Sequence, residues 1–491
     1  MTEEQHTRLL PAGRRQRLAL LVLVSLHAMV ALTMLISQVR PPQIDVAEAG
    51  IPELTKVSDF LGSLVYWQYV PGWALLVALA AVAWAHLRYA KARHVAPNRR
   101  ERVARRYRRA LVFTLLLLPA LKIQSLLDLI AWPGAHALAF LVCLPTTLYA
   151  LWLVHCTQRF RRVPVPLLMA ALGWGAVIAV GFGLTMNEWW KSFSTLHFPI
   201  PDNPLDVMRL KDIGLPMISG FFEELGKGAG VAILFLLYRR HFHSVVSGIV
   251  IGAATGLGFN LVESVTYMAA FDGSSAGFHF WGRQVAGLMA AHTAFTAITG
   301  AAFGIARQLH SRPQQITTIA LGFCTAASAH FCNNAMLDYI AKESHKWFTA
   351  SDTVHVLVVT PAQFLLFQGP LVVLYVLLLR RGLRSEAGGL RVALTNLPPA
   401  SREAITEPEA AVLLSPARRF RLKVDALRAA ENLRHGVAAY RRLARLHAAQ
   451  LELATEHWHS LRGEADPSAP DEASSRARVQ ALKTVLAGSG P

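Results

Sequence analysis

The stretch that decides the fold is residues 213–238, IGLPMISGFFEELGKGAGVAILFLLY, which is mostly apolar. Three ionisable residues interrupt it near its middle: Glu223, Glu224 and Lys227. About 20 apolar residues are the length that an α-helix needs to cross the hydrocarbon core of a bilayer. The stretch therefore predicts a membrane-spanning helix that carries charge inside the membrane.

Apolar segments of similar length lie on both sides of this stretch. Together they give ten predicted spans: 18–38, 64–87, 110–131, 136–156, 164–186, 213–238, 245–270, 284–306, 316–340 and 355–379. The first span is too long for the apolar region of a signal peptide and lacks a convincing cleavage site, so we expect it to be retained. The sequence predicts an all-α, polytopic membrane protein with about ten transmembrane helices and a helical cytoplasmic C-terminal tail.

The composition agrees with a membrane protein. Hydrophobic residues make up 53% of the chain and charged residues only 16%, against about 25% in soluble domains. Lys and Arg exceed Asp and Glu by 49 − 31 = 18, but this excess lies mainly in alternate loops, above all at 88–109. Because positive charge marks the cytoplasmic side of membrane proteins, both termini are predicted to be cytoplasmic, in the inner (plasma) membrane. The basic residues therefore reflect topology, and no nucleic-acid partner is expected.

The predicted domain organisation follows from these patterns. Its parts are a cytoplasmic N-terminus (1–17), five helices (18–186) with the basic loop 88–109, an extracytoplasmic loop (187–212), a four-helix core (213–340), a last loop and helix (341–380), and a cytoplasmic linker and helical tail (381–491). Gly388–Gly389 and Pro398–Pro399 predict the linker. The arginine-rich helical pattern of 416–460 favours a solvated tail that lies on an anionic membrane surface over a specific partner-binding domain.

Polar residues inside four consecutive spans are the candidates for function, because ionisable groups are costly within a membrane. At 1.5 Å per residue, Glu223 lies ~15 Å below the outer end of its span, Glu263 ~10 Å, His292 ~14 Å and His330 ~15 Å. Four helices that alternate in direction thus place these groups in one layer. The shared depth predicts a single site, slightly displaced from the midplane toward the outer face.

Local spacing supports one assembled site. Lys227 follows Glu223 by four residues and Glu224 by three, so that it can neutralise either carboxylate. His330 and Asn334 share a helix face, with Asn333 as the near alternative. The small residues Gly248, Gly252 and Gly256 recur every four residues and predict close helix packing.

The chemistry of this set allows two hydrolytic mechanisms. One carboxylate can act as general base toward water, with histidine and asparagine side chains supporting the oxyanion. Alternatively, carboxylates and histidines can hold a divalent metal that activates the water, with Glu224, Glu263, His292 and His330 as possible ligands. His-Glu-x-x-His, Gly-x-Gly-Asp and Gly-x-Ser-Gly, which mark other intramembrane hydrolases, are absent from the sequence.

Simpler interpretations compete with a catalytic site. Glu223, Glu224 and Lys227 can form a structural ion pair between helices, and His292 or Glu263 can be a satisfied packing residue. An ion-coupled transporter with a midplane Glu/His site is the main alternative function. A non-catalytic scaffold whose tail binds partners does not explain the buried carboxylates.

At these residues the sequence resembles the PrsW family of intramembrane proteases, which is related to the CAAX prenyl endopeptidases and bacteriocin-processing proteins. The family pattern is Glu-Glu-x-x-Lys, Phe-x-x-x-Glu, a His-bearing helix and His-x-x-x-Asn/Asp. It reads here as Glu223, Glu224 and Lys227, then Phe259 and Glu263, then His292, then His330 and Asn334. Ser264 departs from the Asn that often follows the second motif, and the CAAX enzymes would carry His at the position of Glu263.

The resemblance implies an intramembrane endopeptidase acting on a membrane protein, for which the family precedent is an anti-sigma factor. It implies that Glu223 or Glu224 is the general base and that Lys227 sets the carboxylate charge. It also implies that His292 and His330 orient water or bind a metal such as zinc, while Asn334 holds the oxyanion. The depth of the site predicts cleavage near the extracytoplasmic end of the substrate's span. The oligomeric state is not predicted.

Overall fold

The computed structural model describes residues 12–39, 133–197, 214–271, 273–347, 351–464 and 470–487. Every regular element in these ranges is a helix, so the all-α prediction is confirmed. Four helical segments are long and apolar enough to cross a membrane: Pro133–Cys156, Val165–Asn187, Val245–Ala269 and His355–Thr395. The predicted spans 64–87 and 110–131 lie outside the described residues, and the total of ten spans stays a prediction.

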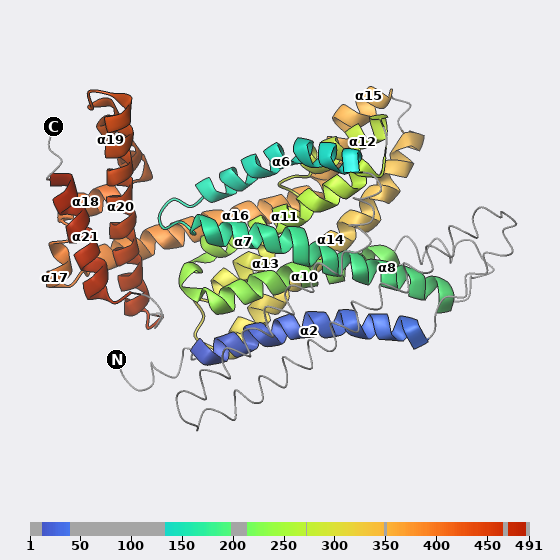
Figure 1. Ribbon diagram of the computed structural model, residues 1–491, viewed down its shortest axis with the longest axis horizontal. Coiled ribbons are helices and arrows are strands. Elements are labelled where there is room, and N and C mark those ends of the chain that lie inside the picture. The colour runs from blue at the N-terminus through green and yellow to red at the C-terminus, as the bar shows by residue number, and fades with distance from the viewer. Residues whose placement is uncertain are drawn as a thin grey trace, which may run out of the picture.

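The membrane part is a bundle of long helices that run side by side along the long axis of the molecule (Figure 1). Its main helices are α2 (Ala12–Val39), α6 (Pro133–Cys156), α7 (Val165–Gly173), α8 (Val180–His197), α10 (Leu215–Leu237), α11 (Val245–Ala269), α13 (His292–Ala306), α14 (Arg312–Trp347) and α16 (Thr360–Thr395). A π-helical turn, η4 (Trp174–Ala179), joins α7 to α8 without a break. Shorter pieces connect the rest: η6 (Arg239–His241), α12 (Gly273–Phe280), η7 (Trp281–Ala286), α15 (Asp352–Val354) and η8 (His355–Val359).

Helix α11 is the centre of the bundle, with almost all of its residues buried. Its glycines allow this, because α13 crosses them at backbone distance. A Cβ at Gly248 would lie 2.2 Å from the Gly300 carbonyl oxygen, and one at Gly256 would lie 2.3 Å from that of His292. The glycine repeat of the sequence is therefore the surface that seats α13 on α11.

The eighth predicted span differs from the structure. Helix α13 begins at His292, whereas the sequence predicted one helix over 284–306. Residues 287–291 form a turn, in which the hydroxyl of Thr293 donates to the Leu288 carbonyl oxygen at 2.6 Å. The helical rise from Arg283 to His292, used for the predicted depth, therefore does not exist, and Arg283 lies much closer to the site.

The C-terminal part is a folded helical domain. Helix α16 continues through Gly388 and Gly389, where the sequence predicted a linker, and enters this domain directly. The domain adds α17 (Pro399–Arg402), α18 (Glu407–Leu413), α19 (Pro416–Arg428), α20 (Leu433–Leu461) and α21 (Glu472–Ala487). Its core includes Leu390, Leu413, Leu453 and Val479, all nearly inaccessible. The segment is thus packed around a core of its own and is not a solvated tail.

The domain docks on the loops at one end of the bundle. Arg161, in the loop between α6 and α7, pairs with Glu456 at 2.6 Å and with Glu452 at 3.4 Å. At the end of α13, Arg307 donates to the Glu464 carbonyl oxygen at 2.7 Å. Both arginine side chains are largely buried, so the contact is part of the folded structure.

Candidate active site

Helix α10 brings three charged side chains into the bundle: Glu223, Glu224 and Lys227. They are 4%, 0% and 0% exposed, so their charges are shielded from water on every side. Close helix contacts enclose them, because a Cβ on Gly220 would lie 2.9 Å from the Phe331 backbone nitrogen of α14. Buried charges require partners, and the neighbouring helices supply them.

Glu224 is fully paired. The Lys227 ammonium donates to its Oε1 at 2.7 Å, and His330 Nδ1 lies 3.1 Å from the same oxygen. The Thr296 hydroxyl of α13 donates to Oε2 at 3.2 Å. Glu224 therefore links α10, α13 and α14 and has no lone carboxylate oxygen left for a reactant.

Glu223 is different, because one of its oxygens has no hydrogen-bond partner. The Asn187 amide of α8 donates to Oε1 at 2.9 Å. The buried Oε2 accepts no hydrogen bond from any described residue. His330 Nε2 and the Lys227 Nζ each lie 3.6 Å from it. Such an orphaned acceptor in a dry site indicates a place for a water or a cation.

Lys227 holds the charge balance of the site. Besides Glu224, its ammonium contacts His292 Nδ1 at 3.0 Å and stands 3.8 Å from the centre of the Phe259 ring. The lysine and the aromatic ring of the second motif thus touch directly. A cation bound at His292 would compete with the Lys227 ammonium for Nδ1. The lysine would then keep its hydrogen bond to Glu224.

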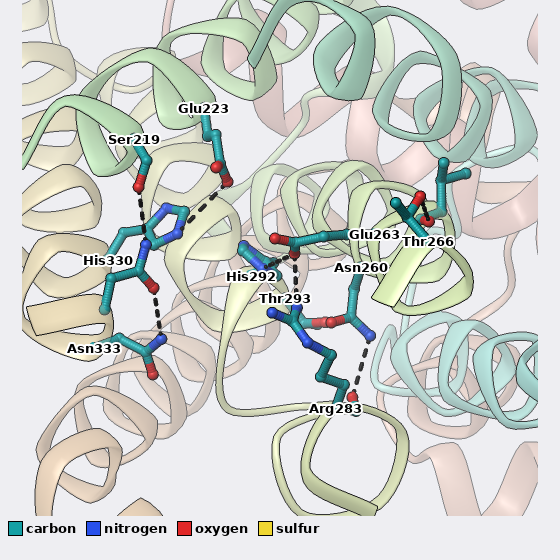
Figure 2. A network of polar contacts seen from close by, with 12 residues as sticks. Ser219, Glu223, Asn260, Glu263, Thr266, Arg283, His292, Thr293, His330 and Asn333 are labelled. Carbon is teal, nitrogen blue, oxygen red and sulfur yellow. Dashed lines mark hydrogen bonds and ion pairs between the residues drawn. The ribbon is translucent and has the colours of Figure 1, made fainter. Parts of the chain in front are cut away.

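Helix α11 reaches the same site through Glu263. Its Oε2 lies 2.6 Å from His292 Nε2 and 2.9 Å from the Arg283 guanidinium (Figure 2). Asn260, one turn earlier, donates from its amide to the Arg283 carbonyl oxygen at 3.2 Å. Tyr267, one turn later, lies under the guanidinium at 3.9 Å. One face of α11 therefore fixes Arg283, and Arg283 and His292 share one carboxylate oxygen.

The histidines of α13 and α14 face each other, with ring centres 4.8 Å apart. Each has a carboxylate on one nitrogen: Glu263 on His292 Nε2, and Glu224 on His330 Nδ1. Of the opposite nitrogens, His330 Nε2 faces the unpaired Glu223 oxygen, whereas His292 Nδ1 contacts the Lys227 ammonium, which a ligand at this nitrogen would displace. This pairing of one nitrogen with a carboxylate is how metal-binding histidines are oriented in proteins.

Three of these residues can hold a metal ion together. One ligand atom each from Glu223, His292 and His330 lies within 4.8 Å of the other two. Two histidine nitrogens and one carboxylate oxygen are the donor set of many catalytic zinc sites, in which water takes the fourth position. The unpaired Glu223 oxygen and the carboxylate-bound histidines fit such an ion. Glu224 and Glu263, which the sequence named as possible ligands, contact the outer nitrogens of the two histidines instead.

Asn334 lies beside this group and not within it. Its amide nitrogen donates to the Ser219 hydroxyl at 3.0 Å, and its oxygen accepts from Asn333 at 3.0 Å. Gln368 of α16 bonds to Asn333 in turn. Ser219 precedes Glu223 by one helical turn, so this amide chain borders the carboxylate and connects α10, α14 and α16.

Some contacting residues were not assigned a site role from the sequence. Asn187 lies one residue beyond the predicted span 164–186 and carries no signal in the sequence, and Arg283 marks only the outer end of the eighth predicted span. Gln368 did carry a signal, because it is a polar residue inside an apolar segment. Its depth, compared with that of the other spans, would have placed it near the site.

A bundle of apolar helices around buried glutamates and histidines fits an intramembrane hydrolase as well as an ion-coupled transporter. The family model of the PrsW family intramembrane metalloproteases matches residues 163–366. This part of the chain is therefore similar to PrsW-family peptidases, which makes the protein a membrane-embedded peptidase. No curated protein and no solved structure matches the chain. The match includes all seven predicted site residues but excludes α2, α6 and the C-terminal domain.

Proposed function

We propose that the protein is an endopeptidase that cleaves a membrane protein in or next to its transmembrane segment, using a water held at Glu223, His292 and His330. The unpaired, buried Oε2 of Glu223 carries this proposal, because it is a carboxylate oxygen beside both histidines that no described side chain satisfies. The family match favours proteolysis over the transporter that the sequence left open. An anti-sigma factor or a similar regulator is the proposed class of substrate.

The chain's own residues account for most of the proposed chemistry. Glu223 Oε2 is the site at which a water proton is accepted or a cation is held, depending on which of the two mechanisms operates. His292 and His330 present one nitrogen each, held in place by Glu263 and Glu224. A divalent cation such as zinc, when bound, would acidify the water and polarise the peptide carbonyl. Asn334 is proposed to support the oxyanion together with His330.

Aromatic side chains next to the histidines would shield the reacting water and the scissile peptide bond from bulk solvent. Phe259 and Phe295 flank the histidines, with Phe295 stacked on His330 at 5.3 Å. An apolar wall of this kind lowers the local dielectric and strengthens each charge–dipole interaction in the site. Lys227 keeps the net charge of the two adjacent glutamates low enough for both to stay buried.

Comparative membrane proteomics tests the proposed function. Cells that produce the wild type and cells that produce Glu223→Gln are compared for membrane-protein fragments, with protein levels matched. A fragment formed only with the wild type identifies the substrate, and its new terminus tests the predicted cut near the extracytoplasmic end. An identical fragment pattern in both cell types would contradict the proposal.

The purified enzyme then separates the two mechanisms. With a metal-assisted reaction, a chelator abolishes cleavage of that substrate and zinc restores it. Active enzyme that contains far less than one metal ion per chain would leave Glu223 as a general base. Metal analysis of Glu223→Gln provides a second readout, since loss of this ligand lowers the bound metal whether or not a substrate is known.

A further inference from the structure

Helix α20 lies across the end of the bundle and runs crosswise to the membrane helices (Figure 1). Residues 157–164 join α6 to α7, and both flanking segments are long and apolar enough to span a membrane. A connection this short between two spans stays at the membrane surface. Because Glu452 and Glu456 of α20 pair with Arg161 in this loop, α20 runs along that surface.

One face of α20 is therefore turned toward the membrane. Glu452 lies on this face. Because an α-helix has 3.6 residues per turn, the residues 7, 11 and 18 positions before Glu452 point in nearly the same direction. Those residues are Arg445, Arg441 and Arg434, and all three side chains are exposed. The face is acidic where it meets the loop arginine and basic along the rest of its length.

The basic part of this face extends beyond the described bundle. In Figure 1 the α19 end of the domain, where α20 begins, projects past α6. The outer side of α6 is apolar and exposed, with Leu141 at 65% and Trp152 at 57%, as expected for a helix that faces lipid. With α6 facing lipid, we expect lipid headgroups next to the N-terminal half of α20.

We propose that Arg434, Arg441 and Arg445 form a binding surface for anionic phospholipid headgroups. The charges of the α20 face follow its surroundings: the glutamates meet Arg161 of the loop and Arg478 of α21, and the arginines would meet the phosphates of the leaflet. Arginine suits this task because its planar guanidinium binds phosphate oxygens in pairs. Helix α20 holds the three side chains in line along the membrane plane, so no ordering of a flexible tail is required.

Photo-crosslinking of the full chain in nanodiscs tests the lipid contact. Benzoylphenylalanine replaces Ala438, which lies between Arg434 and Arg441, or replaces Ala477, an exposed residue of α21. We expect about tenfold more adduct with phosphatidylglycerol at position 438 than at 477, and a loss of the difference in high salt. Equal adducts at both positions, or equally strong adducts in pure phosphatidylcholine, would overturn the proposal.

Matched triple variants test the arginines themselves. R434Q/R441Q/R445Q should lose most of the adduct at position 438. R418Q/R421Q/R428Q removes the same charge from exposed positions of α19 and should keep it. All six side chains are exposed, so both variants should fold, which size-exclusion profiles and melting temperatures will check. An equal loss of the adduct at position 438 in both variants would mean that the positive charge of the whole domain attracts lipid. That result would overturn the proposal of a specific binding surface.

Discussion

Glu223 and Glu224 are adjacent in the chain but have different environments. Glu224 receives Lys227, Thr296 and His330, whereas Glu223 keeps one oxygen without a hydrogen bond from any described residue. A carboxylate with every oxygen engaged stabilises the fold, and a carboxylate with a free buried oxygen can meet a reactant. We therefore propose separate tasks for the two glutamates of one motif.

Substitution of each glutamate by glutamine separates these tasks. Glu223→Gln should lower cleavage by at least about 100-fold and leave the melting temperature close to that of the wild type. Glu224→Gln leaves the Lys227 ammonium buried without its main partner and should cost about 3–5 kcal/mol of stability. Activity and melting are measured on purified protein, with exposed Glu407→Gln as the control. Equal losses of stability in both variants would contradict the proposal that Glu224 stabilises the fold while Glu223 meets the reactant.

Arg283 acts on the site through Glu263 and His292. Its guanidinium lies 2.9 Å from the carboxylate oxygen that His292 Nε2 contacts at 2.6 Å, so it helps to fix the orientation of the imidazole. Arg283→Gln should reduce cleavage and any metal affinity about 10- to 100-fold, as loss of such outer contacts does in known metal sites. Arg283→Lys keeps the charge and should recover part of both.

Kinetics and metal competition measure this effect. A purely structural role for Arg283 would lower stability equally in the glutamine and lysine variants and would not move the zinc affinity of the folded fraction. Wild-type zinc affinity and cleavage in Arg283→Gln would show that Glu263 holds His292 without help.

At the scale of elements, the close contact between α11 and α13 positions His292. A Cβ at Gly256 would lie 2.3 Å from the His292 carbonyl oxygen, at the first residue of α13. A backbone contact this close cannot give way through a side-chain rotation. The position of His292 therefore depends directly on the absence of a side chain at Gly256.

Gly256→Ala should displace the start of α13, destabilise the protein by about 1–3 kcal/mol and reduce cleavage more than its melting temperature alone would explain. Gly277→Ala is the matched control, because nothing lies within 4 Å of a Cβ at that position. Melting in detergent and cleavage by the folded protein are compared for both. Wild-type behaviour of Gly256→Ala would show that α13 can shift without harm.

The sequence predicted most helices of the bundle closely but missed the turn before α13. The predicted spans 245–270 and 136–156 correspond to α11 at Val245–Ala269 and α6 at Pro133–Cys156. Residues 284–291, QVAGLMAA, are as apolar as a helix, and apolarity alone does not distinguish a membrane helix from a turn buried inside the protein. For the same reason Arg283 could not be assigned to the site from the sequence.

The whole molecule combines a membrane peptidase domain with a second helical domain. The arginines of 416–460 led to the prediction of a solvated tail, because charge dominates the sequence there. Helix α20 also supplies Leu446, Leu451 and Leu453 to a buried core, and α16 passes into this core without a linker. Such packing depends on contacts among distant segments, which the pattern of one segment does not reveal.

Buried histidines should make this second domain sensitive to acid. Burial, then the nearby charges of Arg419 and Lys423, lower the pKa of His447 from 6.5 to about 4. Its Nδ1 accepts no hydrogen bond from the described residues. Burial also lowers the pKa of His243 and of His459 at the contact between the domains. All three groups therefore resist protonation in the folded protein.

Acidification should loosen the domain, and His447 should account for part of the effect. Between pH 6.5 and about pH 4 the unfolded chain binds the proton that folded His447 does not, so stability falls as the pH falls. His447→Gln should flatten this slope, with His243 and His459 retaining the rest, while exposed His435→Gln should leave it unchanged. Hydrogen exchange of residues 399–461, followed across this pH range in the full chain, measures the loosening directly. A slope in His447→Gln equal to that of the wild type would exclude His447 as its source.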